Sequence, residues 1–316
     1  MADYSSPSAL ALIALMRLKG VGRRSAVKYV EGFETETNLR ELHNVLRSRL
    51  HSLNIGPSMF EQAWGWSEEQ ASMAEKTGLR VVSIYDPDYP RRLRNIPDPP
   101  AVLFVRGHFK ALGVERAIAI VGTREPTDFG VAVAGRSATT SVHEGFAIVS
   151  GLAHGCDTFA HEACVEARGT GIAVLAHGVD HIYPAGNRGL AEQLIDHGGC
   201  LVSEYPIGAK PFRTFFAERD RIQSGLSDAV LVIETDVVGG TMHTVRFAAA
   251  QHRPLACIAH PVNWRSEEKT KGNQQLLREG AARAIADTND LLAFLAEVSK
   301  TDARKTKPQE QLSFRL

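Results

Sequence analysis

The spacing of apolar side chains changes at two places along the chain. Over residues 8 to about 75 they recur every three or four positions, as at Leu10, Ile13, Leu42 and Leu46, and no stretch alternates as a half-buried strand does. This pattern predicts a small helical domain over residues 1–75. Residues 80–112 hold two short apolar runs around a proline-rich stretch, which predicts a fixed, extended connector.

From residue 117 onward the chain repeats a short apolar run, a glycine or small polar turn, and a segment with helical spacing. The runs are Ala117–Val121, Ala147–Val149, Ile172–Ala176, Cys200–Val202, Ala229–Ile233 and Leu255–Ile258. Continuous apolar runs are typical of strands buried on both faces, and helices between them make such strands parallel. The sequence therefore predicts an α/β fold over residues 80–299 with a doubly wound, mostly parallel sheet. The polar residues 300–316 are predicted to form a disordered tail.

Composition narrows the possible partners. The chain is 44% apolar, and its 36 Lys and Arg residues balance 36 Asp and Glu residues, so any nucleic-acid binding requires a local basic patch. Four scattered cysteines do not make a disulfide scaffold. The N-terminus has no basic leader, and Arg17 and Lys19 interrupt its apolar residues. We therefore expect a cytoplasmic protein with no membrane partner.

A glycine-rich turn in the helical domain is a candidate DNA contact. Gly20 and Gly22 permit a tight turn, and the amides at the start of the next helix can face a phosphate, with Arg23 and Arg24 adding charge. The segment resembles the hairpin of a helix-hairpin-helix motif and is a candidate contact to a duplex or its backbone. The alternative is a turn that joins two packed helices.

The turns after the predicted strands meet at one edge of the sheet, where ligands bind in such folds. One turn holds Gly122, Thr123 and Arg124 with Thr127 at the entry to a helix. Amides, hydroxyls and a guanidinium at one helix start suit an anion. The spacing is neither a P-loop nor GxGxxG, and the alternative is an ordinary turn with a surface arginine.

Two further turns on this edge have similar composition. Ser150 and Gly151 follow one predicted strand, and Gly240 and Thr241 follow another, so each pair places glycine and hydroxyl groups near a helix start. Together with the first turn they predict two or three phosphate-sized sites in one groove.

Four carboxylates near strand ends are candidates for acid–base catalysis: Asp157, Asp180, Glu204 and Glu234. Their more common role is to cap helices and bind turn amides, and no nucleophile motif accompanies them. We expect no catalytic residue.

A metal site is also not expected. His154, Cys156, His161 and Cys164 lie close in sequence, but only the last two have the spacing of one helical face. The sequence therefore predicts neither a metal nor a cofactor.

Residues 85 to 285 contain a series of ordered sequence blocks, which are Tyr89-Pro90 with Leu93, Asp98-Pro99-Pro100, Ile120 to Arg124, Ser150 to Ala153, Gly155 with Asp157 and Ala160-His161, Ile182-Tyr183-Pro184 with Asn187, Ser203 to Pro206, Pro211, Arg219 to Ile222, Gly225-Leu226-Ser227, and Gly272-Asn273. Together these blocks resemble the DNA-processing protein A family (DprA, also called Smf). The resemblance implies an extended Rossmann-like domain after a helix-hairpin-helix (SAM-like) domain.

The resemblance also implies a function. Members bind single-stranded DNA, form homodimers and load a RecA-type recombinase during natural transformation, without catalysis. On this basis Arg124 contacts a phosphate, and basic side chains line the same groove at Lys210, Arg213, Arg219 and Arg221. Phe212, Phe215 and Phe216 are candidates for stacking on bases, and the alternative, which is the more common role of such a cluster, is packing in the core.

The chain departs from the family pattern at three places. Glu218 and Asp220 add carboxylates beside the expected groove, and residues 235–244 differ from the usual Ser-Gly-Ser-Leu-x-Thr. No room is expected for a C-terminal winged helix. These departures leave open a second interpretation, a nucleotide-binding sensor or nucleotide-cleaving protein that acts in defence against foreign DNA.

Overall fold

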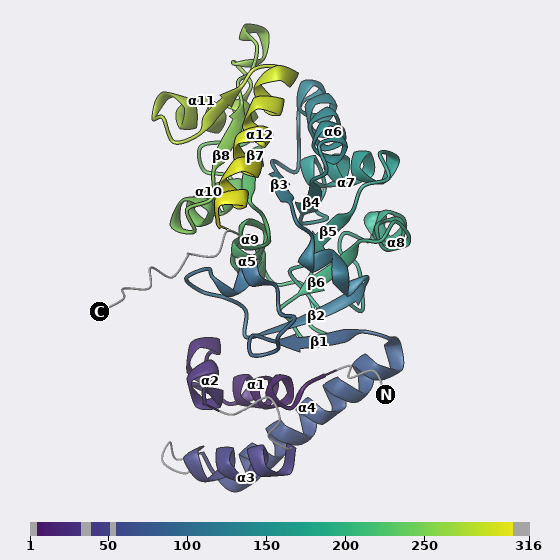
Figure 1. The fold of residues 1–316 in the computed structure, drawn as a ribbon, viewed down its shortest axis with the longest axis vertical. Coiled ribbons are helices and arrows are strands. Elements are labelled where there is room, and N and C mark those ends of the chain that lie inside the picture. The colour runs from purple at the N-terminus through teal and green to yellow at the C-terminus, as the bar shows by residue number, and fades with distance from the viewer. Residues whose placement is uncertain (1–4, 33–38, 51–54, 306–316) are drawn as a thin grey trace, which may run out of the picture.

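A single mixed sheet organises the protein. The computed structural model describes residues 5–32, 39–50 and 55–305. The sheet has nine strands in the order β1-β2-β6-β5-β4-β3-β7-β8-β9, and helices cover it (Figure 1). Every pair from β6 to β9 is parallel, whereas β1 and β2 add antiparallel pairs at one end. The predicted α/β class with a mostly parallel sheet is confirmed.

The six predicted apolar runs form the middle of this sheet. They become β3 (Ala117–Val121), β4 (Ala147–Ser150), β5 (Gly171–Val174), β6 (Cys200–Ser203), β7 (Ala229–Val232) and β8 (Leu255–Ile258). Almost every residue in them is buried, as continuous apolar runs predict. The proposed connector instead contributes two strands, β1 (Arg80–Ser83) and β2 (Val102–Gly107). The edge strand β9 (Arg283–Ile285) was not predicted.

Helices cover both faces of the sheet. One face packs against α6 (Asp128–His143), α7 (Cys156–Glu166), α8 (Arg188–Asp196) and α12 (Thr288–Lys305). The other packs against α5 (Arg91–Arg94), α9 (Arg213–Leu226), α10 (Thr241–Ala250) and α11 (Lys271–Arg278). Alternate residues of each strand therefore enter different cores: Ile118 and Ile120 of β3 face α6, and Ala119 faces α9.

In the described part of the chain, four helices precede the sheet. They are α1 (Pro7–Arg17), α2 (Arg23–Val30), α3 (Leu39–Leu50) and α4 (Pro57–Thr77). The Ser6 side chain caps α1 by accepting from the Ala9 amide, and Gly78, at φ 67°, ends α4. Their buried side chains share one core with β1, β2, β5 and β6, so the four helices pack directly on the sheet.

Helix α12 continues to Lys305 and so enters the segment 300–316 for which a disordered tail was predicted. Residues 306–316 lie outside the described part of the chain. Within the described residues, none of the helices is long and apolar enough to cross a membrane.

Candidate functional site

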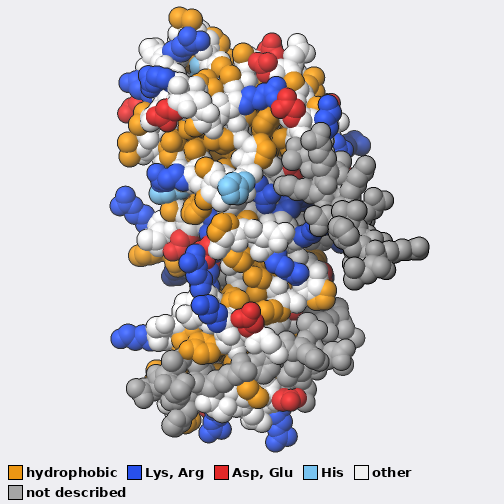
Figure 2. Space-filling view, turned by 60° about the vertical axis from the view of Figure 1, so that its left-hand side comes forward, with side chains coloured by type: hydrophobic (Ala, Val, Ile, Leu, Met, Phe, Trp, Pro, Cys, Tyr) orange, Lys and Arg blue, Asp and Glu red, His pale blue; other side chains and the backbone are white. Residues whose placement is uncertain are grey.

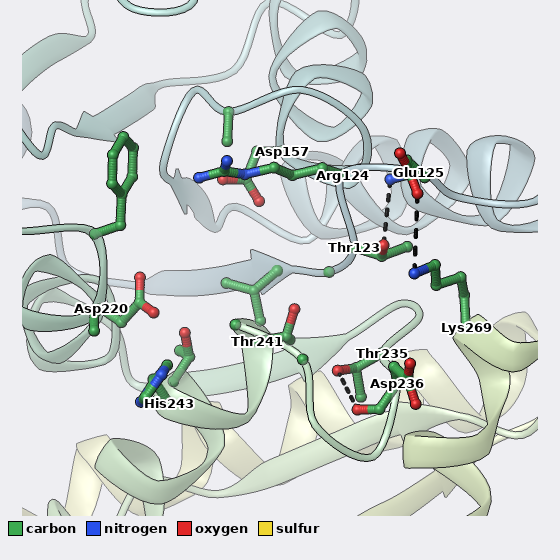
Figure 3. A pocket seen from close by; sticks show the side chains of 18 of the residues that line it. Thr123, Arg124, Glu125, Asp157, Asp220, Thr235, Asp236, Thr241, His243 and Lys269 are labelled. Atoms are coloured by element: carbon green, nitrogen blue, oxygen red, sulfur yellow. Dashed lines mark hydrogen bonds and ion pairs between the residues drawn. The ribbon is translucent and has the colours of Figure 1, made fainter. Parts of the chain in front are cut away.

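A cavity opens where the order of the strands reverses. From β3 the chain continues through β4, β5 and β6 on one side, then returns to β7 on the other side of β3. The loops that leave β3 and β7 therefore diverge, and such a switch point is the usual ligand site of an open α/β sheet. These loops and α9 enclose a cavity of about 610 Å³ (Figure 3).

The first wall is the predicted turn after β3. The Thr123 amide donates to the Glu234 carbonyl (2.8 Å), and the Thr123 carbonyl accepts from the Cys156 amide (3.1 Å). A Cβ on Gly122 would lie 2.4 Å from the Cys156 sulfur, so the backbone here approaches α7 too closely for a side chain. These contacts hold the turn, and Arg124 extends from it.

Arg124 combines charge with an aromatic surface. Its side chain is exposed, and its guanidinium carbon lies 4.9 Å from the centre of the Phe216 ring on α9. Phe216 also contacts Tyr183 (6.0 Å between ring centres), which is 48% exposed. Phe212, 61% exposed, contacts Phe215 at the start of α9. A cation and accessible rings thus lie along one edge.

The second wall is the loop between β7 and α10. Asn273 fixes it: its side-chain oxygen accepts from the Thr235 amide (2.9 Å), and its side-chain nitrogen donates to the carbonyls of Ile233 and Ile258. Helix α10 begins after Gly240 with no side-chain cap. Thr241, the first residue of α10, lines the cavity, whereas the next two amides, those of Met242 and His243, donate to the carbonyls of Gly239 and Gly240.

The floor of the cavity holds two carboxylates and an arginine. Arg219 Nη1 lies 3.9 Å from Asp157 Oδ2, and Arg219 Nε lies 3.6 Å from Asp220 Oδ1. Burial raises the pKa of both carboxyl groups, and for Asp220 it raises the pKa to about 7 although Arg219 opposes the shift. Figure 3 shows Asp157 beside Arg124, with Asp220 farther along the cavity.

The cavity is not a uniformly positive groove. Four basic residues in its lining are matched by four acidic ones, and Lys269 lies 3.9 Å from Glu125 at the rim. On the face of the molecule drawn in Figure 2, Lys and Arg side chains are likewise scattered among acidic and apolar ones. The lining therefore holds no excess of basic over acidic residues.

Comparison with known proteins then places the chain in a family. The model of the DNA recombination-mediator protein A family matches residues 80–296, which include every strand of the sheet and the whole cavity. The chain belongs to this family.

Similar members of the DNA recombination-mediator protein A family cover most of the chain. Protein Smf of Synechocystis sp. is 41% identical over 298 residues, 92% of this chain and 73% of that protein. The structure of DprA from Streptococcus pneumoniae, 27% identical, superimposes with a TM-score of 0.71 over 93% of this chain and 98% of that one. DNA processing protein A of Helicobacter pylori, described by its single-stranded DNA binding mode, is 28% identical. It gives a TM-score of 0.62 over 71% of this chain and 96% of that one.

Most of the predicted phosphate-binding residues lie together in this family member. The cavity is lined by Gly122, Thr123, Arg124, Arg213, Arg219, Gly240 and Thr241. Gly151 lines a small recess that shares Arg124 and Phe216 with the cavity. Lys210 is exposed three residues before α9, outside both linings.

Two predicted hydroxyl groups are used inside the protein. Thr127 caps α6, and its amide and hydroxyl both donate to the buried Glu234 carboxylate (2.8 and 2.6 Å). This carboxylate therefore binds at the start of α6, where the sequence predicted a phosphate. Ser150 is buried and donates to the Ile120 carbonyl (2.7 Å).

The placement of Arg221 in the groove was wrong. Its side chain is 2% exposed, and both terminal nitrogens donate to Glu204 at 2.7 and 2.6 Å, while its Nε donates to the Asp98 carbonyl. A guanidinium held by a buried carboxylate in this way has no face left for DNA.

The arginines of the predicted hairpin also bind within the chain. Gly20 forms the expected turn at φ 87°, and Gly22 precedes α2. Arg23 pairs with Asp98 and lies 3.5 Å from Glu204, and Arg24 lies 3.0 Å from Asp98. These contacts join the start of α2 to the segment between α5 and β2 and to the loop after β6, so acidic partners within the chain already bind both arginines.

The remaining candidates have structural contacts. Asp180 accepts from the Gly208 amide (2.9 Å). His161, Cys156 and Cys164 are buried, whereas His154 is exposed. Among the residues that the structure describes, no three potential metal ligands gather. Lys269 and His243 also line the cavity, although the sequence did not predict them as site residues.

Proposed function

We propose that the chain binds single-stranded DNA along this edge of the sheet, with phosphates at Arg124 and Arg213 and bases against the exposed rings. The observation that carries this proposal is the exposed Arg124 guanidinium lying on the Phe216 ring at the border between the cavity and the adjoining recess. A cation beside an aromatic face binds a phosphate and the neighbouring base of one strand together.

The accessible rings favour a single strand over a duplex. The Tyr183 ring contacts Phe216, and the Phe212 ring contacts Phe215, so an exposed ring adjoins each of these two residues of α9. Unpaired bases can stack on such rings, whereas the paired bases of a duplex are already stacked on one another. The family, and the single-stranded DNA binding mode described for the Helicobacter pylori relative, support the same ligand.

The finer role rests on the family resemblance. We extend the proposal to a homodimer in the cytoplasm that presents the bound strand to a RecA-type recombinase, without catalysing a reaction. Light scattering tests the dimer. Recombinase assembly on a strand coated with single-strand-binding protein, with and without this chain, tests the loading.

The binding proposal is tested with a fluorescent 30-mer of dT. Arg124→Ala should lower the affinity about 10- to 100-fold, as loss of a charge-assisted hydrogen bond predicts. The control is Arg168→Asn: Arg168 is exposed at the opposite edge of the sheet, and asparagine tolerates its φ of 55°. The control should bind as the wild type does.

Salt dependence adds a second readout. The logarithm of the wild-type affinity should fall by about 0.7 per phosphate contact for each tenfold rise in salt, and Arg124→Ala should reduce that slope. Equal affinities for wild type and Arg124→Ala would refute the site. No strand binding by the wild type would refute the function and favour the nucleotide sensor, to be followed by a nucleotide screen.

A further inference from the structure

A second groove lies at the edge of the sheet opposite Arg124, where β3, β4 and β5 begin. It has a volume of about 370 Å³ and is formed by three segments, each of which leads into one of these strands. Its lining includes Arg116, directly before β3, and Arg168, before β5, together with the acidic residue Glu115. Basic residues therefore outnumber acidic ones in this lining, unlike in the cavity at the other edge.

The backbone around the groove accommodates both arginines. Gly145 has a φ of 78°, and a Cβ on it would lie 2.7 Å from Arg116 Nη2, so the Arg116 side chain lies across a position that suits glycine alone. The guanidinium carbon of Arg116 also lies 5.4 Å from the centre of the Phe146 ring. Arg168 follows the end of α7 at a φ of 55°, where glycine is the usual residue. The protein therefore keeps an arginine there in a strained conformation.

The two guanidinium groups have hydrogen-bond donors to offer. Neither has a hydrogen-bond or ion-pair partner among the residues that the structure describes. They are not needed as caps for α6 and α7, which end at this edge, because the backbone amides that follow each helix already donate to carbonyls of its last turn. The donors of both arginines thus remain available to a ligand.

The rest of the lining indicates what kind of anion fits. Val114 and Val142 are half-buried walls, whereas the Phe146 ring lies beneath Arg116 and is only 2% exposed. Nucleic-acid bases stack on accessible rings, and this lining, all of it within the described residues, offers none. Carboxylates beside an aliphatic side chain fit both features, since a guanidinium binds a carboxylate through two parallel hydrogen bonds.

We propose that this groove binds an acidic segment of a protein partner, with carboxylates at Arg116 and Arg168 and an aliphatic side chain against Val114 and Val142. The complementary charge of the groove and its aliphatic walls carry this choice of occupant. The inference goes beyond strand binding and does not depend on it. Because the two sites lie at opposite edges of the sheet, the protein can hold the partner and a DNA strand together.

The test measures the fluorescence anisotropy of a labelled peptide, Gly-Asp-Asp-Leu-Asp-Asp-Gly, titrated with the full chain at low salt. Arg116→Gln and Arg168→Asn should each weaken binding about tenfold, the lower limit for loss of a charge-assisted hydrogen bond. Exchanging the aspartates of the peptide for asparagines should weaken binding at least as much. Both variants should bind a 30-mer of dT as the wild type does, which shows that they are folded.

The matched control is Arg136→Gln, because Arg136 is exposed on α6 but does not line the groove. This variant should bind the peptide as the wild type does. An equal loss in Arg136→Gln would show attraction to overall charge and would overturn the proposal. So would a wild-type protein that does not bind the peptide, or displacement of the peptide by dT from Arg124→Ala. Strand binding is measured on the same samples, so either proposal can fail while the other stands.

Discussion

The buried carboxyl group of Asp220 should make the stability of the protein depend on pH. Its pKa is raised from 3.8 to about 7, chiefly by burial, and the groups that surround it include Arg219, Asp157, Arg124 and Thr244. A carboxyl group whose pKa is raised on folding holds its proton more tightly in the folded chain. The folded state therefore loses stability as the pH rises from about 4 to about 7.

The shift sets the size of the effect. Three pKa units correspond to about 4 kcal/mol of unfolding free energy, or about 1.4 kcal/mol for each pH unit inside the window. Asp220→Asn keeps the shape and removes the titration. Between pH 5 and pH 8 the free energy of unfolding of the wild type should fall by about 3 kcal/mol relative to the variant.

The assay is urea unfolding of both proteins at pH 5, 6, 7 and 8, with the variant subtracted from the wild type. Groups that do not interact with Asp220 cancel in the difference, and among them is His161, whose pKa burial lowers to about 4. Parallel profiles over the whole range would show that Asp220 is ionised throughout and would refute the reasoning.

Two further outcomes follow from the same contacts. Replacing Arg221 by Met leaves the Glu204 carboxylate without its buried partner, so the free energy of unfolding measured in urea should fall by about 3 to 5 kcal/mol. A fall of less than about 1 kcal/mol would contradict the assigned pair. The affinity for a 30-mer of dT should fall as the pH rises from 6 to 8, because ionised Asp220 repels the phosphates at the rim. Asp220→Asn should bind the oligonucleotide equally at both pH values. An equal pH dependence in the variant would assign the effect to another group.

The sequence predicted the middle of the sheet because those strands are buried on both faces. Short continuous apolar runs that alternate with helical segments of this length are typical of parallel strands, and in this chain they form β3 to β8. Strand β9 has three residues, of which only Ile285 is buried, so it leaves no such run. The direction of β2 depends on its pairing with β6, which lies about 100 residues away and leaves no local signal, and β1 in turn pairs with β2.

The turn at Arg124 was predictable because the loops after parallel strands meet at one edge. The sequence did not show which arginine of α9 faces the cavity. Arg219 and Arg221 lie about 200° apart around the helix, so one contacts the cavity floor and the other Glu204. The role of Thr127 also depends on a distant residue. Its hydroxyl donates at the start of α6 to Glu234, which lies 107 positions farther along the chain.

Cross-linking tests the central claim, that a single strand lies along the edge with Arg124 and the exposed rings. A dT oligonucleotide that carries 5-iodo-deoxyuridine at several positions is irradiated with the protein, and the linked peptides are identified by mass spectrometry. The account predicts links to the peptides with Tyr183 and with Phe212 to Phe216, which disappear in Arg124→Ala. Links confined to the hairpin at Arg23, or to the opposite edge at Phe146, would contradict it.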